Sequence, residues 1–552
     1  MTAIKLTILL ALTFALAPAR AQISVGRYGI FESAFQTSGK YANPYTAIRA
    51  EATFERPDHS MWRIPLFWDG ESNWKVRISP EMVGEWSYGI TSTDAGLDGR
   101  TGEFICTESG RAGGIVASTR WPGHFERQNG APFFFLGDTA WAYFTDIPEE
   151  KHDRAQAEAY LKARAGQGFT VIHSMLLSEG GDGNSGGPPW QSIADEQINP
   201  AYFREVERRI AYANQQGVTV GIALAWGDKQ RTERYPWRRM PNLEARRRYA
   251  RYVAARFSAY DVYFLISGEW HGEIRTRGNM SAQQVFNEFV ELGNEFAAAE
   301  PHHRMIGIHP MGSEGSSREF ASTPWMSFGD YQQNYSHLHG KILASRGLGR
   351  PVVNSEYGYF LRDQNDDGKP DKDNSYSADD MRFASWDIAM AGGYLVTGFG
   401  TTYFGGHRDP GNFDWAAPKN RIWEQQIGAL KRFFEAADFH RLIPADELIS
   451  SETPRGDDIY TGAPGRRGRE LHPPKATYWA LTDPGRTYVA YVRGITAPVR
   501  LELGARANRF HVREFNPRTG EFRELPEVEI RDSWQFTPRS AEDWVMLLEA
   551  VP

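Results

Sequence analysis

The 552-residue sequence has very little cysteine, no excess of basic charge and no long apolar segment beyond its first residues. Its single cysteine, Cys106, can form no internal disulfide, so the fold must depend on buried cores or a bound metal. No later stretch approaches the roughly 18 consecutive apolar residues of a membrane-spanning helix. Lys and Arg number 62 against 69 Asp and Glu, a formal net charge of -7. We therefore expect no membrane span and no nucleic-acid partner.

The first 21 residues have the pattern of a signal peptide. A single lysine precedes an apolar run over 6–17, and Ala19-Arg20-Ala21 then gives the A-x-A pattern that signal peptidase recognises. Cleavage after Ala21 would start the mature chain near Gln22. We expect the protein to be secreted or periplasmic.

The remaining length is too great for one hydrophobic core, so we expect several domains. Residues 22–113 alternate apolar and polar positions between Pro and Gly turns, which predicts an N-terminal β-sandwich. Its tryptophans, Trp62, Trp68, Trp74 and Trp86, could form a carbohydrate-binding face, but aromatic residues dominate sandwich cores and we favour packing. Residues 441–552 begin with a Gly, Pro and Arg-rich linker and then alternate again, which predicts a C-terminal β-sandwich.

Between the sandwiches, residues 114–440 repeat an apolar strand followed by an amphipathic helix. We predict eight strands, at 133–136, 170–175, 219–224, 262–266, 304–308, 325–328, 351–353 and 393–397. Predicted helices occupy 151–167, 200–216, 243–259, 281–300 and 377–390, and several open with Asp, Ser or Pro. Eight such repeats predict a (β/α)8 TIM barrel flanked by the two sandwiches.

Two of the predicted barrel strands run directly into glutamates. The apolar segment 262–266 is followed by Glu269, and 351–353 is followed by Glu356. Barrel enzymes place their chemistry at these carboxyl ends, and glycosidic cleavage needs two carboxyl groups on either side of the anomeric carbon. We predict Glu269 as the acid and Glu356 as the anionic partner, with Glu273 as the reserve acid. The alternative for either residue is an ion pair at the barrel rim.

Polar and aromatic side chains follow the other predicted strands and are candidates for substrate contact. They are Asp138, Trp141, His173, Trp226, Trp270, His309, Tyr331, Gln332, Gln333 and Tyr357, with Asp228 near Trp226. Trp270 could desolvate Glu269, and Tyr357 could hydrogen-bond the anion of Glu356. His173 and His309 could equally be structural links, and Asp138 could brace the first loop.

Four motifs together resemble one known family. They are PFFFLGDTAWAYF at 132–144, GIHPMGSEGSS at 307–317 with YQQN at 331–334, PVVNSEYGY at 351–359 and AGGYLVTGFGTTY at 391–403. The barrel resembles the apiosidase-like, or collagenase-like, glycoside hydrolases related to clan A. The first region resembles the immunoglobulin-like domain found upstream of such barrels, and the tail resembles the small sandwich that the family names for collagen binding.

This resemblance implies glycan chemistry. In related enzymes the acid/base carboxylate stands at the end of strand four and the nucleophile at the end of strand seven, and the matching residues are Glu269 and Glu356. Gly268 occupies a position where clan A enzymes commonly have Asn, so the sugar 2-hydroxyl must be held differently. We expect a retaining enzyme that acts on a plant or algal polysaccharide without a catalytic cofactor.

The segment 363–371 has the spacing of a calcium loop. Asp363, Asn365, Asp367 and Asp371 would supply oxygen ligands, with Gly368 at the turn. Asn374 replaces the usual bidentate Glu, so an acidic solvated loop is the alternative. If Ca2+ binds as a structural ion, EDTA should lower the melting temperature and added Ca2+ should restore it.

Three other functions are compatible with parts of the pattern. Glu269, His271 and Glu273 could suggest a metallohydrolase, although no H-E-x-x-H motif accompanies them. A non-catalytic glycan-binding protein would need the aromatic rim but neither glutamate. A polysaccharide lyase would act through a base and a Tyr or His, and would release an unsaturated product.

Overall fold

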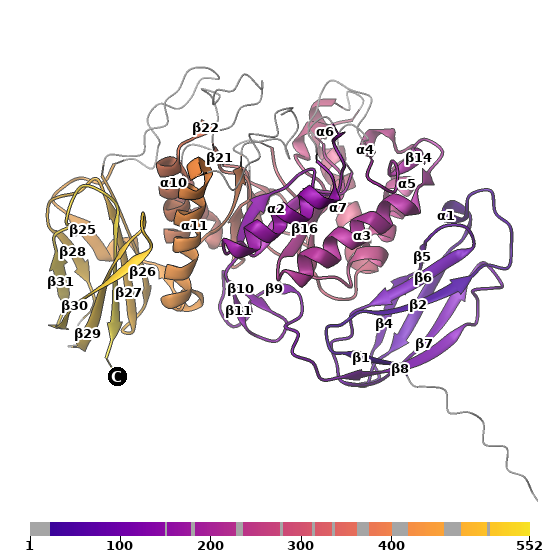
Figure 1. Cartoon of the computed structure of the whole chain (residues 1–552), viewed down its shortest axis with the longest axis horizontal. Coiled ribbons are helices and arrows are strands. Elements are labelled where there is room, and N and C mark those ends of the chain that lie inside the picture. The colour runs from indigo at the N-terminus through magenta and orange to yellow at the C-terminus, as the bar shows by residue number, and fades with distance from the viewer. Residues whose placement is uncertain are drawn as a thin grey trace, which may run out of the picture.

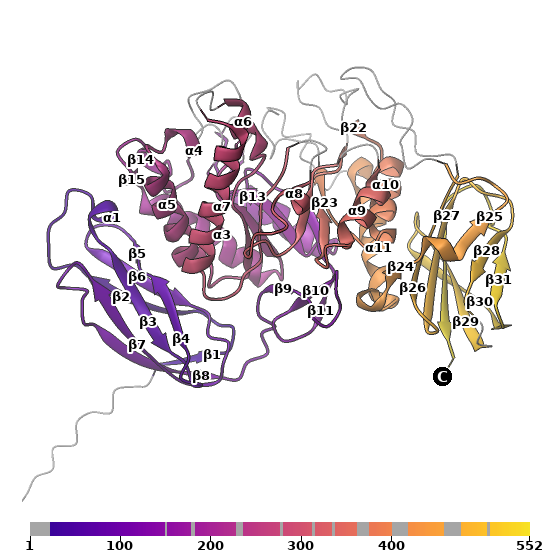
Figure 2. The ribbon, with the colours of Figure 1, turned by 180° about the vertical axis from the view of Figure 1, so that it is seen from behind.

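The computed structural model describes residues 23–148, 152–177, 183–227, 236–276, 280–311, 315–333, 337–360, 375–399, 418–456, 476–504 and 508–551. A sheet-rich region stands at each end of the molecule and a barrel lies between them (Figures 1 and 2). No helix in these ranges is long and apolar enough to cross a membrane. The predicted fold class, a barrel flanked by sheet-rich regions, is confirmed.

The N-terminal region contains a five-stranded and a three-stranded sheet. The strands of the five-stranded sheet have the order β1 (Ser24–Gly26), β8 (Thr101–Thr107), β7 (Gly84–Ser92), β3 (Ala50–Glu55), β4 (Met61–Pro65). Those of the three-stranded sheet have the order β2 (Phe31–Gln36), β6 (Asn73–Ile78), β5 (Phe67–Trp68). A short helix, α1 (Pro44–Ala47), follows β2. Trp62, Trp74 and Trp86 are 6%, 4% and 1% exposed, so these three belong to the core. Trp68 is half-buried.

Eight parallel strands form the barrel. In chain order they are β12 (Leu136–Thr139), β13 (Val171–Met175), β16 (Thr219–Ala223), β17 (Val262–Leu265), β18 (Ile306–Gly307), β19 (Gly329–Tyr331), β20 (Val352–Asn354) and β23 (Tyr394–Phe399). Each is hydrogen-bonded to its neighbour in the order β18, β17, β16, β13, β12, β23, β20, β19. A parallel bridge between Ile306 and Met326 joins the two ends of this order. The sheet therefore closes on itself.

Helices surround the strands. The longer ones are α2 (Arg154–Gly166), α3 (Pro200–Gln215), α5 (Leu243–Phe257), α7 (Ala282–Ala299), α9 (Leu338–Arg346), α10 (Ala378–Met390) and α11 (Pro418–Ala436). The shorter elements are α4 (Pro236–Arg239), α6 (His271–Thr276), α8 (Ser316–Glu319), β14 (Trp190–Ser192), β15 (Gln197–Ile198), β21 (Tyr359–Phe360) and β22 (Ser375–Tyr376). The side chains of Asp153, Ser281 and Ser377 cap the N-termini of α2, α7 and α10. Such capping residues are the sequence signal from which a helix start is predicted.

Two barrel strands begin three or four residues later than predicted. The apolar runs 133–135 and 325–328 resemble strands but lie at or before the strand starts, where they pack beneath the barrel. Phe135 and Phe328 approach Phe125, with ring centroids 5.1 and 6.3 Å away. Phe125 belongs to a small sheet at this end of the barrel, formed by β9 (Ile115–Ala117), β10 (Phe125–Arg127) and β11 (Pro132–Phe133). Asp138 and Asp330 consequently lie within strands.

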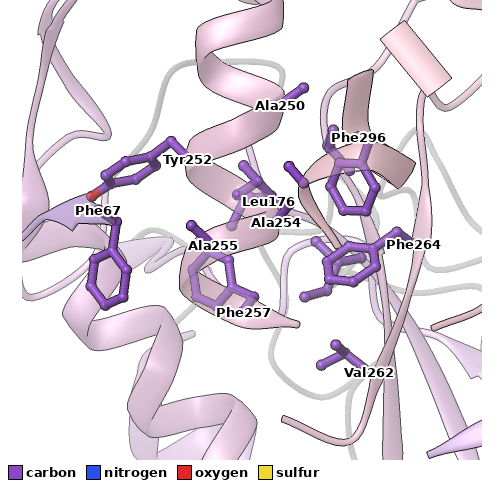
Figure 3. Packing of buried hydrophobic residues seen from close by; sticks show 14 of the residues in the cluster. Phe67, Leu176, Ala250, Tyr252, Ala254, Ala255, Phe257, Val262, Phe264 and Phe296 are labelled. Atoms are coloured by element: carbon purple, nitrogen blue, oxygen red, sulfur yellow. The ribbon is translucent and has the colours of Figure 1, made fainter. Parts of the chain in front are cut away.

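Helix α5 links the barrel to the N-terminal sandwich. Tyr252 points from α5 toward Phe67, with ring centroids 6.4 Å apart, while Phe264 of β17 packs on Phe296 of α7 beyond the helix (Figure 3). Buried charges join the same two regions, since Arg256 of α5 donates to Asp69 at 2.8 Å. The sandwich is therefore held by both apolar and ionic contacts.

The C-terminal region holds a six-stranded and a three-stranded sheet. The strands of the six-stranded sheet have the order β24 (Ile443–Pro444), β26 (Thr477–Asp483), β27 (Thr487–Arg493), β32 (Trp544–Ala550), β29 (Asn508–Asn516), β30 (Glu521–Ile530). Those of the three-stranded sheet have the order β25 (Ile449–Ser451), β28 (Val499–Glu502), β31 (Ser533–Phe536). The 3-10 turn η4 (Phe439–Arg441) precedes both sheets in the chain, and η5 (Asp446–Leu448) lies between their first strands, β24 and β25. Trp386 of α10 stacks on Tyr491 of β27 with centroids 5.3 Å apart. This contact fixes the sandwich to the barrel wall.

Candidate active site

Glu269 and Glu356 meet at one end of the barrel through a shared glutamine. Glu269 follows β17, Glu356 follows β20, and Gln332 follows β19, so all three stand at carboxyl ends of parallel strands. The amide nitrogen Nε2 of Gln332 donates to Oε1 of Glu269 and to Oε2 of Glu356, each at 2.8 Å. Only the NH2 group fits this position, because an amide oxygen would face two acceptors.

This shared donor limits the distance between the two carboxylates. Both oxygens lie 2.8 Å from one nitrogen, so they are separated by no more than twice that distance. Retaining glycosidases hold their two carboxyl groups roughly 5 to 5.5 Å apart, whereas inverting enzymes need about 6.5 to 9.5 Å to admit a water. The upper bound for these two oxygen atoms lies below the range of inverting enzymes.

Glu356 is held by three donors while remaining 13% exposed. The hydroxyl of Tyr359 donates to its Oε1 at 2.5 Å, and Nε2 of His309 approaches its Oε2 at 3.2 Å, the oxygen that Gln332 also contacts. Trp141 Nε1 in turn donates to the Tyr359 oxygen at 3.1 Å. Several donors to one carboxylate favour its ionised form.

His309 is an imidazolium in this arrangement. Burial raises the pKa of Asp330, and the charge of His309 opposes this rise. With Asp330 ionised, the one hydroxyl proton of Ser355 has two close oxygen neighbours, Asp330 Oδ1 and the carbonyl of Tyr331, which can only accept it. The Ser355 oxygen must therefore accept from His309 Nδ1, 2.9 Å away, while Nε2 of the same ring donates to Glu356. Both ring nitrogens then carry protons.

The electrostatics agree with this protonation. Burial by itself lowers the pKa of His309, but the carboxylates of Asp330 and Glu356 outweigh it and raise the pKa to about 10. His309 and Asp330 are both 0% exposed, so little water screens their attraction. A fixed positive charge therefore lies beside Glu356 at neutral pH.

Glu269 sits on a backbone that few non-glycine residues adopt. Its φ is +41°, in the left-handed region. Hydrogen bonds on both sides hold it there: Gly268 N donates to Ala225 O at 2.9 Å, and Trp270 N donates to His309 O at 3.3 Å. Residues kept in such conformations are common at functional sites.

Gly268 is required because the indole of Trp226 covers it. A Cβ at position 268 would lie 1.8 Å from Trp226 Cε3, far inside van der Waals contact. Trp226 therefore fills the space that a side chain such as Asn would need. Any side chain at position 268 would therefore require Trp226 to move.

Aromatic rings pack around the two carboxylates. Trp141 and Trp226 meet edge to face with centroids 4.6 Å apart, and His309 lies 5.9 and 5.4 Å from them. His173 is 0% exposed and lies 5.8 Å from Trp141. Burial and the nearby His309 lower the pKa of His173 well below its usual value, so this ring is neutral.

Asp138 lies away from this site. Its carboxylate accepts from Tyr160 at 2.7 Å and pairs with Arg164, both on α2, and the residue is 0% exposed. Because Asp138 is inside β12 rather than after it, its side chain faces the surrounding helices. The placement fits bracing and does not support the predicted sugar contact.

Four other predicted contact residues also face away from the carboxylates. Trp270 is 2% exposed and packs on Phe289 and Phe320 with centroids 6.0 and 5.2 Å away, so its ring belongs to the core. Tyr357 is 0% exposed and pairs with Ser385 of α10 at 2.6 Å.

Tyr331 and Gln333 point outward because they alternate with Gln332 along the same extended chain. The hydroxyl of Tyr331 pairs with Ser345 of α9, and Gln333 Oε1 accepts from Lys341 at 2.7 Å. Substrate contact by these two residues is not supported by their placement.

The residues of the metallohydrolase alternative separate in space. Glu269 faces Gln332, His271 Nε2 lies 3.2 Å from Glu319, and Glu273 is buried at 0% exposure. Across the described ranges, no group of three or more His, Cys, Asp or Glu could hold a metal ion. The predicted calcium loop at 363–371 and Asp228 lie outside the described residues.

Two residues at the site were missed by the sequence analysis. Tyr359 takes the role predicted for Tyr357, and Asp330 supports His309 from within β19. A signal existed for Asp330, since it immediately precedes the polar run 331–333. The sequence offered no way to choose between two tyrosines that are two positions apart.

The site can be compared with known proteins. A family model described as Apiosidase-like, catalytic domain, matches residues 122–441, more than half of the chain. A model for a domain of unknown function, DUF5060, matches residues 24–93. Comparison with curated proteins gives no match.

Solved structures with the same fold include several glycoside hydrolases. A candidate glycoside hydrolase from Bacteroides vulgatus ATCC 8482 is 18% identical with a TM-score of 0.71, over 96% of this chain and 100% of that chain. A glycoside hydrolase family 5 protein from the same organism is 17% identical with a TM-score of 0.60, over 79% and 93%. At such identities the likeness concerns the fold.

Proposed function

The chain belongs to the family of Apiosidase-like catalytic domains, and from that premise we propose that it is a retaining glycoside hydrolase in which Glu356 is the nucleophile and Glu269 the acid/base. The observation that carries this proposal is the pair of 2.8 Å hydrogen bonds from Gln332, which keeps the two carboxylates close together. Such spacing leaves no room for a water between the sugar and Glu356.

The proposed reaction has two steps. Glu356 attacks the anomeric carbon and forms a glycosyl ester, while Glu269 gives its proton to the departing oxygen. Glu269 then removes a proton from water, the water attacks the same carbon, and the ester bond breaks. Two inversions restore the original configuration and return both carboxyl groups to their starting states.

The surroundings of Glu356 suit a carboxylate that is the nucleophile of the first step and the leaving group of the second. His309 and Tyr359 stabilise its anion before attack, and they stabilise it again when the ester breaks. Gln332 fixes the distance to Glu269. The Trp141 and Trp226 rings are 6% and 5% exposed, and they pack on each other and on His309 as a rigid apolar wall beside the carboxylates.

A plant or algal polysaccharide is the proposed substrate class, and export through the 1–21 segment would bring the enzyme to it. The support for these two points is the A-x-A pattern together with the aromatic surroundings of the carboxylates.

A test of the mechanism begins with a polysaccharide panel and reducing-end detection, followed by proton NMR of the first-formed product. We expect the substrate's anomeric configuration in that product. Appearance of the opposite anomer would refute retention, and an unsaturated product absorbing in the ultraviolet would indicate a lyase.

Substitutions then separate the two carboxylates. Glu356→Ala should abolish turnover of every substrate. Glu269→Ala should keep activity on aryl glycosides with good leaving groups, and azide should increase it by attacking the glycosyl-enzyme. Glu319→Ala is the matched control, because Glu319 is an exposed glutamate near the same loop that contacts neither carboxylate. Near wild-type rates for Glu356→Ala would contradict the assignment.

A further inference from the structure

A second concave site lies on the side of the barrel, where the N-terminal sandwich meets α5. The cavity has a volume of about 460 Å³, and its walls come from α1 and β3 to β7 of the sandwich and from α5 of the barrel. Small-ligand sites typically occupy roughly 300 to 1,000 Å³ and favour boundaries between domains. Figure 1 shows α1 and β5 beside α5, away from β21 and β22, the strands that follow Glu356 in the chain.

Aromatic side chains form much of its wall. Trp68, Trp74, Tyr45 and Tyr252 all line it, and Trp68 is only half-buried. Tyr45 and Tyr252 meet edge to face with centroids 5.6 Å apart. Tyr45, Trp74 and Tyr252 are each 4% exposed and form the base of the wall, so Trp68 is the ring with appreciable accessible surface.

Two polar atoms in the same wall have no partner among the residues that the structure describes. They are the hydroxyl of Tyr45, a residue 4% exposed, and the indole Nε1 of Trp74, also 4% exposed. Buried donors are rarely left unsatisfied in native proteins, since each costs roughly 1 to 3 kcal/mol. Both atoms have almost no accessible surface, so they lie behind the cavity wall and take no part in contacts with a ligand.

The rim adds charge of both signs and hydroxyls. Arg49 is 82% exposed and its carboxylate neighbour, Glu244, is 3.9 Å away, so its guanidinium is largely open to solvent. Glu51 is exposed on β3 beside it. Arg248 and Arg251 on α5 are instead engaged by Glu196 and Glu295. The rim therefore presents both donors and acceptors.

This combination fits a sugar ring, which has apolar C–H faces and an edge of hydroxyl groups. We propose that the cavity binds one or two sugar units of a carbohydrate chain and anchors that chain beside the catalytic barrel. The choice of carbohydrate over another polar ligand rests on the proposed function. The half-buried ring of Trp68 and the exposed guanidinium of Arg49 would carry most of the recognition.

The test uses the full-length chain carrying Glu356→Gln, so that it binds without hydrolysis. Affinity gel electrophoresis in gels containing galactomannan, arabinoxylan, pectin or alginate measures retardation. We expect retardation in at least one gel, weakened about tenfold or more by Trp68→Ala, the factor that a loss of 1.4 kcal/mol gives. Arg49→Ala removes the solvent-exposed guanidinium at the rim and should weaken binding in the same gel without lowering the melting temperature.

Trp121→Ala is the matched control, since Trp121 is half-buried near His440, outside this cavity. It should leave retardation unchanged. Turnover of aryl glycosides by chains that retain Glu356 should be the same with and without Trp68→Ala. Failure of that turnover in every chain would refute the proposed function but not the binding site.

Absence of retardation in all four gels would overturn the inference. So would equal retardation of the Trp68→Ala, Arg49→Ala and parent chains, because the carbohydrate would then be bound elsewhere.

Discussion

Replacing His309 by glutamine should shift the pH dependence of catalysis. The substitution keeps a donor near Glu356 but removes the positive charge 3.2 Å from its Oε2. Hydrogen bonds to charged groups contribute roughly 1.5 to 3 kcal/mol, and 1.36 kcal/mol corresponds to one pH unit. The acidic limb of the kcat/KM profile should therefore move upward by about one to two pH units.

The single substitution also leaves Asp330 buried without its cation. Removing one partner of a buried pair costs roughly 3 to 5 kcal/mol, so His309→Gln should be markedly less stable. The double variant His309→Gln/Asp330→Asn removes both charges and should recover most of that stability while keeping the shifted acidic limb. Urea unfolding and pH profiles on an aryl glycoside measure the two effects separately.

An acidic limb within about 0.3 pH units of the wild-type limb, in a folded double variant, would show that His309 carries no charge near Glu356. A structural role alone would change the unfolding free energy without moving the profile. The pH profile therefore decides between positioning and scaffolding.

Three other outcomes are expected. Because the pKa of His309 is raised from 6.5 to about 10, its contribution to stability is complete below pH 6.5 and is lost as the pH rises through 10; urea unfolding should show this decline, and an unchanged free energy would contradict it. Tyr359→Phe should lower kcat roughly 10- to 100-fold through the lost 2.5 Å bond, whereas Tyr357→Phe, the matched control, should leave kcat unchanged. Gly268→Ala should displace Trp226, lower the unfolding free energy by roughly 1 to 3 kcal/mol and reduce kcat/KM; wild-type values for both would refute the packing argument.

The barrel was predictable from the sequence because parallel strands buried on both faces leave continuous apolar runs. Segment 262–266 was placed almost residue for residue as β17. The same rule placed β12 and β19 three and four residues too early, because apolar runs that pack beneath the barrel directly precede these two strands. Periodicity cannot distinguish an apolar strand from an apolar segment packed just outside it.

The direction of side chains beyond strand ends was not predictable in the same way. Gln332 faces the site while its neighbours on both sides face outward, which follows from the alternation of an extended chain once the position of β19 is known. After Glu356 the chain leaves its strand, so alternation no longer applies. Only the folded path shows that Tyr359 returns to the carboxylate and Tyr357 does not.

The left-handed backbone at Glu269 has a consequence for engineering. A side chain in this conformation costs roughly 1 to 2 kcal/mol relative to the right-handed region, and glycine avoids that cost. Glu269→Gly is therefore expected to melt at a higher temperature while losing the proton donor. Selection of variants for heat resistance alone would favour replacement of this glutamate, so a thermostabilised enzyme must be screened for turnover at every round.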